Sequence, residues 1–137
     1  MPYLLDTNIV SDIIRHPSRD AARRIRSLGE LQVRTSIVVA AELKFGAEKV
    51  QSSVLARKID AALDRMIVLP LRPPVDDVYA RIRSQVERAG TPIGANDLLI
   101  ASQAIALDLV LVTDNVREFS RIEGLHVENW LREDETS

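Results

Sequence analysis

Short apolar runs alternate along the chain with longer stretches in which apolar residues recur at helical spacing. Tyr3–Leu5 predicts a buried strand, and the isoleucines and valine that follow predict a helix ending before Pro17. The same pattern predicts further strands at residues 31–35, 66–69, 109–112 and 125–127, and helices at residues 20–28, 37–50, 53–65, 73–89, 98–107 and 117–122.

This alternation of strands and helices predicts an α/β fold with a mainly parallel sheet. The strand at residues 109–112 has no polar residue, so we expect helices on both faces of the sheet. The helices outweigh the strands, which predicts short strands under a thick helical cover. Without a linker or repeat, residues 1–131 are expected to form a single domain, followed by a polar C-terminal tail at residues 132–137.

The charge balance excludes a strongly basic nucleic-acid-binding surface over the whole chain, because 20 acidic residues face 18 basic ones and the net charge is −2. A local basic surface remains open, because 15 of the 18 basic residues are arginines, which bind phosphates and carboxylates well. Five of these arginines lie close together in the sequence, namely Arg15, Arg19, Arg23, Arg24 and Arg26.

The chain has no cysteine, which excludes a disulfide scaffold, a thiolate zinc site and a cysteine nucleophile. Its only histidines are His16, expected at the surface after a helix, and His126, expected in a strand. Any bound metal is therefore expected to be a hard cation with oxygen ligands. The sequence begins without a signal peptide and lacks a membrane-spanning run, so we expect a cytoplasmic protein.

Acidic and amide side chains follow the predicted strands or begin the helices. In parallel α/β sheets ligands bind at these junctions. Asp6 comes directly after the first strand, and Asp97 begins an apolar helix after a loop rich in glycine and proline. Asp114 and Asn115 follow the strand at 109–112, with Glu118 one helical turn later. None of these junctions has a glycine-rich phosphate-binding loop, so the candidate chemistry is acidic.

Glu42 stands out because almost all its neighbours in a predicted helix are apolar. A buried carboxylate without a partner costs several kcal/mol in order of magnitude. It needs a cation, a hydrogen-bond partner or access to water. Lys44 lies on another side of the helix, so it is not a ready partner. A metal ion is one way to supply the missing positive charge.

Each acid also has an ordinary structural explanation. Asp6 fits an N-cap, and Asp97 fits the first turn of a helix, where the helix dipole favours negative charge. Asp114 and Glu118 fit solvated surface charges beside Arg117. Glu42 fits a side chain that reaches water or pairs with an arginine. The hypothesis of a shared site rests on the set, because the acids fall where an α/β sheet places its ligands.

Four sequence blocks, in this order, resemble the PIN-domain ribonucleases, and in particular the VapC-type toxins of bacterial toxin–antitoxin pairs. They are YLLDTNIVSDII, TSIVVAAELKFG, TPIGANDLLIASQAIALDLVLVT and DNVREFSRIEGLHVENW. Together they span nearly the whole chain. The resemblance implies a PIN-like three-layer fold, in which helices flank a short, mainly parallel sheet. It further implies a metal-dependent endoribonuclease that cleaves RNA phosphodiester bonds.

The resemblance also assigns roles to residues. Asp6, Glu42 and Asp97 match the family's three central acidic positions, which implies that they are catalytic and hold Mg²⁺ or Mn²⁺. The family's fourth acid lies near the position of Asn115 or directly before Phe119. Because the first of these is an amide here, Glu118 is the choice for the fourth catalytic acid. Asp114 is the alternative, and the residues expected to orient carboxylates or water are Thr7, Asn8, Thr113 and Asn115.

The partners implied by the resemblance are an RNA substrate, a small VapB-like antitoxin and a second copy of the chain. The basic stretch from Arg15 to Arg26 would contact either RNA or the antitoxin. Trp130 is expected to pack at the end of the core rather than to stack on a base.

Rival functions are weaker. A phosphoryl-receiving regulator would need a lysine after a late strand, but the lysines lie only at Lys44, Lys49 and Lys58. A P-loop enzyme would need GxxxxGK[ST], which is absent. The main alternative is a non-catalytic PIN-like binding or scaffold domain. The three intact central acids argue against it.

Overall fold

The computed structural model describes residues 1–131, so the predicted tail at residues 132–137 lies outside the described residues. Its sheet has five strands in the order β3-β2-β1-β4-β5, and every neighbouring pair is parallel. The strands are β1 (Tyr3–Leu5), β2 (Val33–Ser36), β3 (Ile67–Leu69), β4 (Val110–Val112) and β5 (Val127–Glu128). The predicted α/β class and the short parallel sheet are confirmed.

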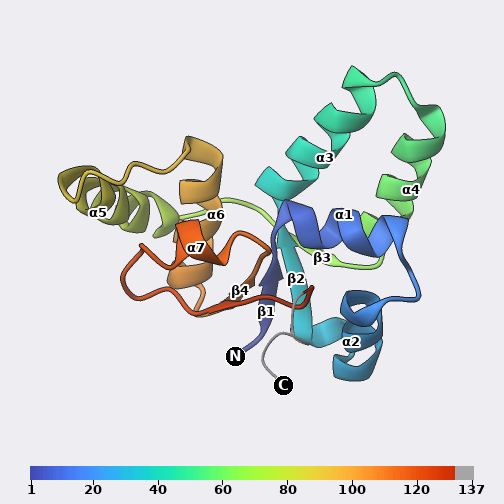
Figure 1. Ribbon diagram of the computed structural model, residues 1–137, viewed down its shortest axis with the longest axis horizontal. Helices are drawn as coiled ribbons and strands as arrows, with labels where there is room; N and C mark the ends of the chain where they lie inside the picture. The colour runs from blue at the N-terminus through green and yellow to red at the C-terminus, as the bar shows by residue number, and fades with distance from the viewer. Residues whose placement is uncertain (132–137) are drawn as a thin grey trace.

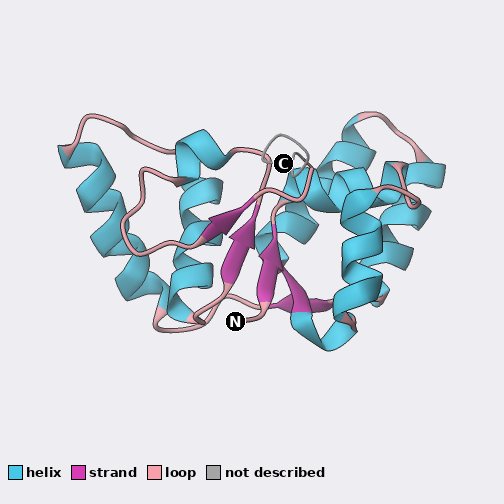
Figure 2. Cartoon of the chain, turned by 60° about the horizontal axis from the view of Figure 1, so that its bottom comes forward, coloured by secondary structure: helices cyan, strands magenta, loops and turns pink. Residues whose placement is uncertain are grey.

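Helices flank this sheet on both sides, as Figures 1 and 2 show. The first group consists of α1 (Thr7–Arg15), α2 (Asp20–Leu28), the short 3₁₀ helix at Glu30–Gln32, α3 (Ile37–Lys49) and α4 (Ser53–Asp64). The second group consists of α5 (Val75–Arg88), α6 (Ala95–Ala106) and α7 (Val116–Phe119). In Figure 1 the two groups lie on opposite sides of the sheet. None of the helices in the described part of the chain is long and apolar enough to cross a membrane.

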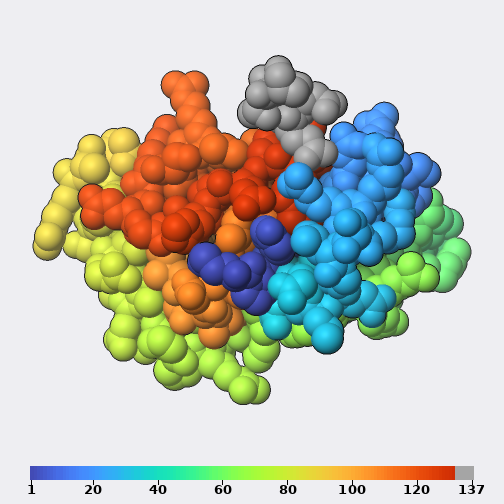
Figure 3. Space-filling view, turned by 90° about the horizontal axis from the view of Figure 1, so that it is seen from below, coloured from blue at the N-terminus to red at the C-terminus, as the bar shows by residue number. Residues whose placement is uncertain are grey.

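The core lies around β1 and β4, the central pair of the sheet. The side chains of Leu4, Leu5, Leu111 and Val112 are fully buried, which explains why these strands read as apolar runs. Figure 3 shows the N-terminal residues between the segment around residue 32 and the last described residues. Trp130, 1% exposed, closes this part of the core, as expected from the sequence.

The strand order places the functional junctions side by side. The chain moves outward from β1 to β2 and β3, then crosses to the other side of β1 to form β4 and β5. Leu5 lies opposite Val112 in the register, so β1 and β4 end at the same level. Ligands bind at such a reversal of strand order, outside the carboxyl ends of the strands. Residues 6 and 113, which come next in the chain, are therefore neighbours.

Three local predictions are wrong. The alternation at residues 31–35 predicted a strand, but Glu30–Gln32 forms a 3₁₀ helix and β2 begins at Val33. Leu31, 77% exposed, takes no part in the core that the alternation implied. The helix predicted at 117–122 ends at Phe119, and the last strand begins at Val127. His126 is thus exposed just before β5 and is not a strand residue.

Candidate active site

A cavity of about 340 Å³ opens at the carboxyl ends of β1 and β4. Three of the predicted acids, from α3, α6 and the end of β1, line it together with polar residues of α1 and of the turn after β4. The lining residues are Asp6, Thr7, Asn8, Ser11, Arg15, Glu42, Asp97 and Asn115. The structure therefore brings together residues that lie up to 109 positions apart in the chain.

Asp6 is the most buried acid of the pocket, with 4% of its surface exposed. One carboxylate oxygen accepts a hydrogen bond from the backbone N–H of Thr7 at 2.8 Å and so caps α1. The other accepts from the Thr113 hydroxyl, also at 2.8 Å. Burial raises the pKa of Asp6, these two hydrogen bonds lower it, and the charges of Glu42 and Glu118 raise it further. Asp6 is thus both an N-cap and a pocket residue.

Glu42 is half-buried and finds a neutral hydrogen-bond donor. The Thr7 hydroxyl donates to its Oε1 at 2.7 Å, across 35 positions of sequence. Lys44 does not reach Glu42; its ammonium lies 3.9 Å from a carboxylate oxygen of Asp60 on α4. The apolar neighbours of Glu42 pack into the core, while Glu42 itself points to the pocket. The hydrogen bond from Thr7 offsets part of the free-energy cost of burying the Glu42 carboxylate. Because Thr7 is neutral, it leaves the negative charge of Glu42 in place.

Asp97 lies in the first turn of α6 and is the electrostatic centre of the group. Its pKa is raised to about 7, first by burial and then by the charges of Asp6, Glu118 and Glu42. A hydrogen bond with Glu118 also favours the protonated form of Asp97. Converging carboxylates raise one another's pKa because each charge disfavours ionisation of the next.

Glu118 belongs to the acidic group through α7. Its Oε2 accepts a hydrogen bond from the Asn115 side-chain amide at 2.7 Å, and its charge acts on both Asp6 and Asp97. The Asp114 carboxylate instead accepts a hydrogen bond from the Asn129 amide at 3.0 Å. This difference favours Glu118 over Asp114 as the fourth acid. The Asn115 side chain thus holds Glu118, three positions later in the chain.

Polar side chains of α1 and the turn after β4 surround these carboxylates. The Asn8 side chain accepts a hydrogen bond from the backbone N–H of Asp114 at 3.0 Å and donates a long one to the Thr113 hydroxyl at 3.5 Å. The expected supporting residues therefore do contact the acids or one another.

Ser11 was not predicted from the sequence, but it lines the pocket one helical turn after Thr7 and Asn8. The sequence showed Arg15 only as a member of the basic stretch. In the structure it lies one helical turn after Ser11 and also lines the pocket. The signal that could have found both is their helical spacing from Asn8, since residues three to four positions apart share a helix face.

The donor set fits a hard divalent cation. All four acidic groups offer oxygen ligands, and after burial the charges of Asp6, Glu118 and Glu42 raise the pKa of Asp97, which a cation would reverse. Within residues 1–131, no three His, Asp or Glu side chains already stand together as a ready-made ligand group. In the structure three of the carboxylates turn to the hydroxyl or amide donors Thr7, Thr113 and Asn115.

Comparisons with known proteins point the same way. The PIN domain family matches residues 3–125. The ribonuclease VapC2 of Rickettsia felis is 38% identical over 132 residues, which cover 95% of this chain and 98% of the relative. The tRNA(fMet)-specific endonuclease VapC of Shigella flexneri is 33% identical, over 95% of this chain and 98% of that protein. Among solved structures, VapBC2 of Rickettsia felis bound to a promoter DNA fragment contains a chain that matches with a TM-score of 0.86 and 36% identity, over 95% of this chain and 99% of that one.

Proposed function

The chain belongs to the PIN-domain family and is a VapC-type ribonuclease toxin of a toxin–antitoxin pair, and we propose that it cleaves RNA in a metal-dependent reaction at the acidic pocket. In this proposal Asp6, Glu42, Asp97 and Glu118 are the catalytic acids. Asp6, Asp97 and Glu42 hold Mg²⁺ or Mn²⁺. We further propose that residues 1–131 form one PIN domain, which the family match and the position of Trp130 in the core support.

The observation that carries this proposal is the electrostatic state of Asp97. Its carboxyl lies among three other acids from distant parts of the chain, and its pKa is raised to about 7. Folding brings these like charges together at a cost, and a surface site would have avoided that cost. Divalent cations favour such oxygen-rich, negatively charged sites. The arrangement therefore supports a site built to hold positive charge.

A divalent cation held there would supply the positive charge that activates a water for attack and offsets the charge that develops on the phosphate. The residues of the chain keep the carboxylates in place for it. The Thr113 hydroxyl fixes Asp6, the Thr7 hydroxyl fixes Glu42, and the Asn115 amide fixes Glu118. Each of these donors is neutral, so each orients a carboxylate without cancelling its charge.

RNA is the proposed substrate, and we propose that cleavage is endonucleolytic, as the name of the Shigella flexneri relative states for that protein. Arg15 supports an RNA path, because it lines the pocket and is exposed at the end of α1. Arg23 and Arg26 are exposed on α2 and extend the proposed path, because such side chains would track the phosphate backbone.

The proposed protein partner is a small VapB-like antitoxin, since the similar solved structures are VapBC complexes. Exposed apolar side chains near the junction of α3 and α4 support this proposal. Phe45, Val50 and Val54 are 67%, 63% and 54% exposed. Isolated chains seldom leave large apolar side chains grouped in water, and an amphipathic helix would cover them. Figure 1 shows the two helices extending away from the sheet.

We also propose a homodimer and a cytoplasmic location, where RNA and antitoxin are both present. Exposed apolar residues in the edge strand β3 and just after it support self-association, because Ile67 and Leu71 are each 39% exposed. Light scattering on the purified protein tests the dimer, and a monomer mass at micromolar concentration would contradict it.

The experiment that tests the proposed reaction is RNA cleavage after complete removal and controlled return of metal. We expect no cleavage in chelator, recovery with Mg²⁺ or Mn²⁺, and products without a 2′,3′-cyclic phosphate, because water rather than the ribose hydroxyl attacks. Cleavage that persists in chelator would overturn metal dependence. A protein that cleaves no RNA with either metal would favour the scaffold alternative.

A further inference from the structure

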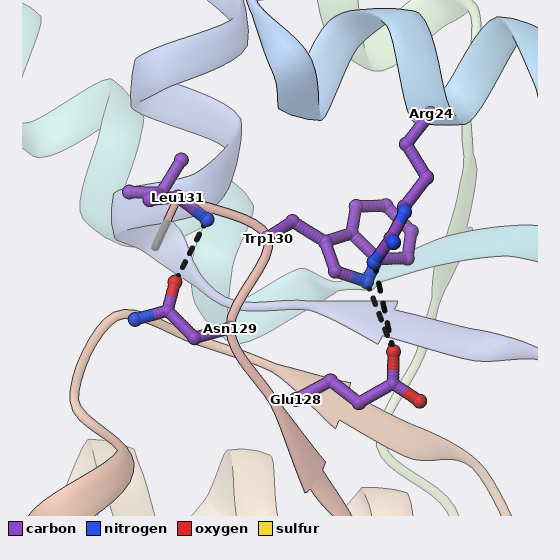
Figure 4. Close-up of polar contacts among 5 residues, drawn as sticks. All are labelled: Arg24, Glu128, Asn129, Trp130 and Leu131. Atoms are coloured by element: carbon purple, nitrogen blue, oxygen red, sulfur yellow. Dashed lines mark hydrogen bonds and ion pairs between the residues drawn. The ribbon is translucent and has the colours of Figure 1, made fainter. Parts of the chain in front are cut away.

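The last described residues form an anchored segment, Glu128–Leu131, next to α2 (Figure 4). Trp130 is the anchor. It is 1% exposed and packs edge-on against Tyr3, with ring centroids 5.1 Å apart. The guanidinium of Arg24 lies over the Trp130 ring, 5.4 Å from its centroid. Its indole N–H donates to Glu128 at 3.1 Å. The position of the neighbouring Asn129 is thereby fixed.

Asn129 uses both ends of its side-chain amide. Its oxygen accepts a hydrogen bond from the backbone N–H of Leu131 at 2.8 Å, and its nitrogen donates to a carboxylate oxygen of Asp114 at 3.0 Å. The opposite amide orientation would place an oxygen against a carboxylate and a donor against an N–H. Only one orientation satisfies both partners, so Asn129 connects the anchored segment to the turn at residues 113–115.

This turn carries the contacts that orient two of the acids. Thr113 donates its hydroxyl proton to Asp6 at 2.8 Å and accepts from the backbone N–H of Asn115 at 3.0 Å. A hydroxyl has one proton. Because the Thr113 oxygen accepts from the N–H of Asn115, its own proton points to the carboxylate of Asp6. The side chain of Asn115 in turn holds Glu118 at 2.7 Å.

The turn is fixed from two sides. On the side of α1, the Asn8 side chain accepts from the backbone N–H of Asp114 at 3.0 Å. On the side of β5, the backbone N–H of Thr113 donates to the carbonyl oxygen of Glu128 at 2.9 Å. Asn129 adds a side-chain contact next to this backbone pairing. It lies outside the pocket, yet it acts on the middle residue of the turn that orients the acids.

We propose that Asn129 is a positioning residue of the nuclease: through Asp114 it holds the turn at 113–115, so that Thr113 stays on Asp6 and Asn115 stays on Glu118. The inference rests on the proposed function of the pocket. Partners that orient metal-binding carboxylates without touching the metal typically change metal affinity or activity by roughly 10–100-fold when removed. We expect Asn129→Ala to fall at the lower end of that range, because Asn8 and Glu128 still hold the turn.

The test compares Asn129→Ala with Gln85→Ala, a matched control. Gln85 also carries a half-buried side-chain amide that makes two hydrogen bonds, to the carbonyl oxygen of Arg121 at 3.1 Å and from the N–H of Glu123 at 3.3 Å. These contacts hold the chain after α7, away from the acids. We expect similar falls in Tm for both variants. Only Asn129→Ala should weaken Mn²⁺ binding by calorimetry and lower kcat, each about tenfold with little change in KM.

A reciprocal exchange tests the hydrogen bond itself. Asn129→Asp alone places a carboxylate against Asp114 and should impair the protein at least as much as Asn129→Ala. Combining Asn129→Asp with Asp114→Asn restores a donor and an acceptor in reversed order, and the carboxylate at position 129 still accepts from the N–H of Leu131. Recovery of Mn²⁺ affinity and kcat in the double variant assigns the effect to this contact. Asp114→Asn alone keeps an acceptor oxygen for the Asn129 amide, so it serves as the reference; an impaired Asn129→Asp variant that the added Asp114→Asn does not restore overturns that assignment.

The outcomes separate this inference from the proposed function. If the wild-type protein binds Mn²⁺ and cleaves RNA while Asn129→Ala behaves like Gln85→Ala in both measurements, the positioning role is overturned and the proposed function stands. If the wild-type protein neither binds Mn²⁺ nor cleaves RNA, the proposed function fails, and the inference fails with it.

Discussion

The hydroxyl of Thr113 donates a 2.8 Å hydrogen bond to the carboxylate of Asp6, although 107 positions separate the two residues in the chain. The contact exists because β1 and β4 are neighbours that end at the same level. Thr113 is fully buried and Asp6 is 4% exposed, so the hydrogen bond between them is largely shielded from water.

Thr113→Val is expected to lower both stability and activity. The substitution keeps the shape of the side chain but leaves Asp6 and the N–H of Asn115 without their hydroxyl partner, at about 1–3 kcal/mol per buried group. Activity should fall by roughly 10–100-fold through misplacement of Asp6. Thr113→Ser retains the hydroxyl and is the control. Chemical denaturation and a cleavage assay check this, and a Thr113→Val variant as active as Thr113→Ser would refute it.

The metal-free protein is expected to lose stability as pH rises from 5 to 8. The pKa of Asp97 is about 7 in the folded chain against an ordinary value of 3.8. Between these values the folded state holds a proton that the unfolded state has lost. The stabilisation is therefore complete below pH 4 and disappears as pH rises through 7. Asp97→Asn, which carries a neutral amide at every pH, should flatten this profile and raise Tm at pH 8. A wild-type profile no steeper than that of Asp97→Asn would contradict it.

Millimolar Mg²⁺ or Mn²⁺ is expected to raise the Tm of the wild-type protein, because a ligand of the folded state stabilises it by mass action. Since protons and cations compete for Asp97, the rise should be larger at pH 8 than at pH 6. Differential scanning fluorimetry with Asp97→Asn as the control measures it. An equal rise in wild type and Asp97→Asn would place the bound metal elsewhere on the chain.

The fourth acid is expected to be Glu118. Glu118→Gln removes a charge that acts on Asp6 and Asp97, and cleavage should fall more than the roughly 10–100-fold typical of outer partners. Asp114→Asn removes a charge from the turn after β4 and should lower the rate of cleavage less than Glu118→Gln does. Both variants are assayed at saturating metal. A larger loss in Asp114→Asn than in Glu118→Gln would reverse the assignment.

The fold and the pocket acids could be predicted because their signals are local. Asp6 and Asp97 stand at junctions marked by the apolar pattern, and Glu42 stands out against apolar neighbours in its own helix. The strand predicted at 31–35 began too early, because an alternation of polar and apolar side chains does not distinguish a strand from an exposed 3₁₀ helix.

The partners that orient the acids could not be predicted in the same way. Asn129 gives no signal in the sequence, because its contact with Asp114 depends on β5 pairing beside β4 and on Trp130 fixing the neighbouring backbone. Ser11 was missed for a similar reason, since its role follows from which face of α1 meets the pocket. Such contacts become visible only when tertiary structure closes the pocket.

The measurement that tests the central claim most directly is the rate of RNA cleavage by Asp97→Asn relative to wild type at saturating Mg²⁺ and pH 8. The amide can still donate to Glu118, so the variant should fold and, without metal, melt higher than wild type. We expect its cleavage rate to be at least roughly 100-fold lower, beyond the effect of an outer partner. A folded Asp97→Asn protein that cleaves RNA at the wild-type rate would contradict the assignment of this acidic pocket as the active site.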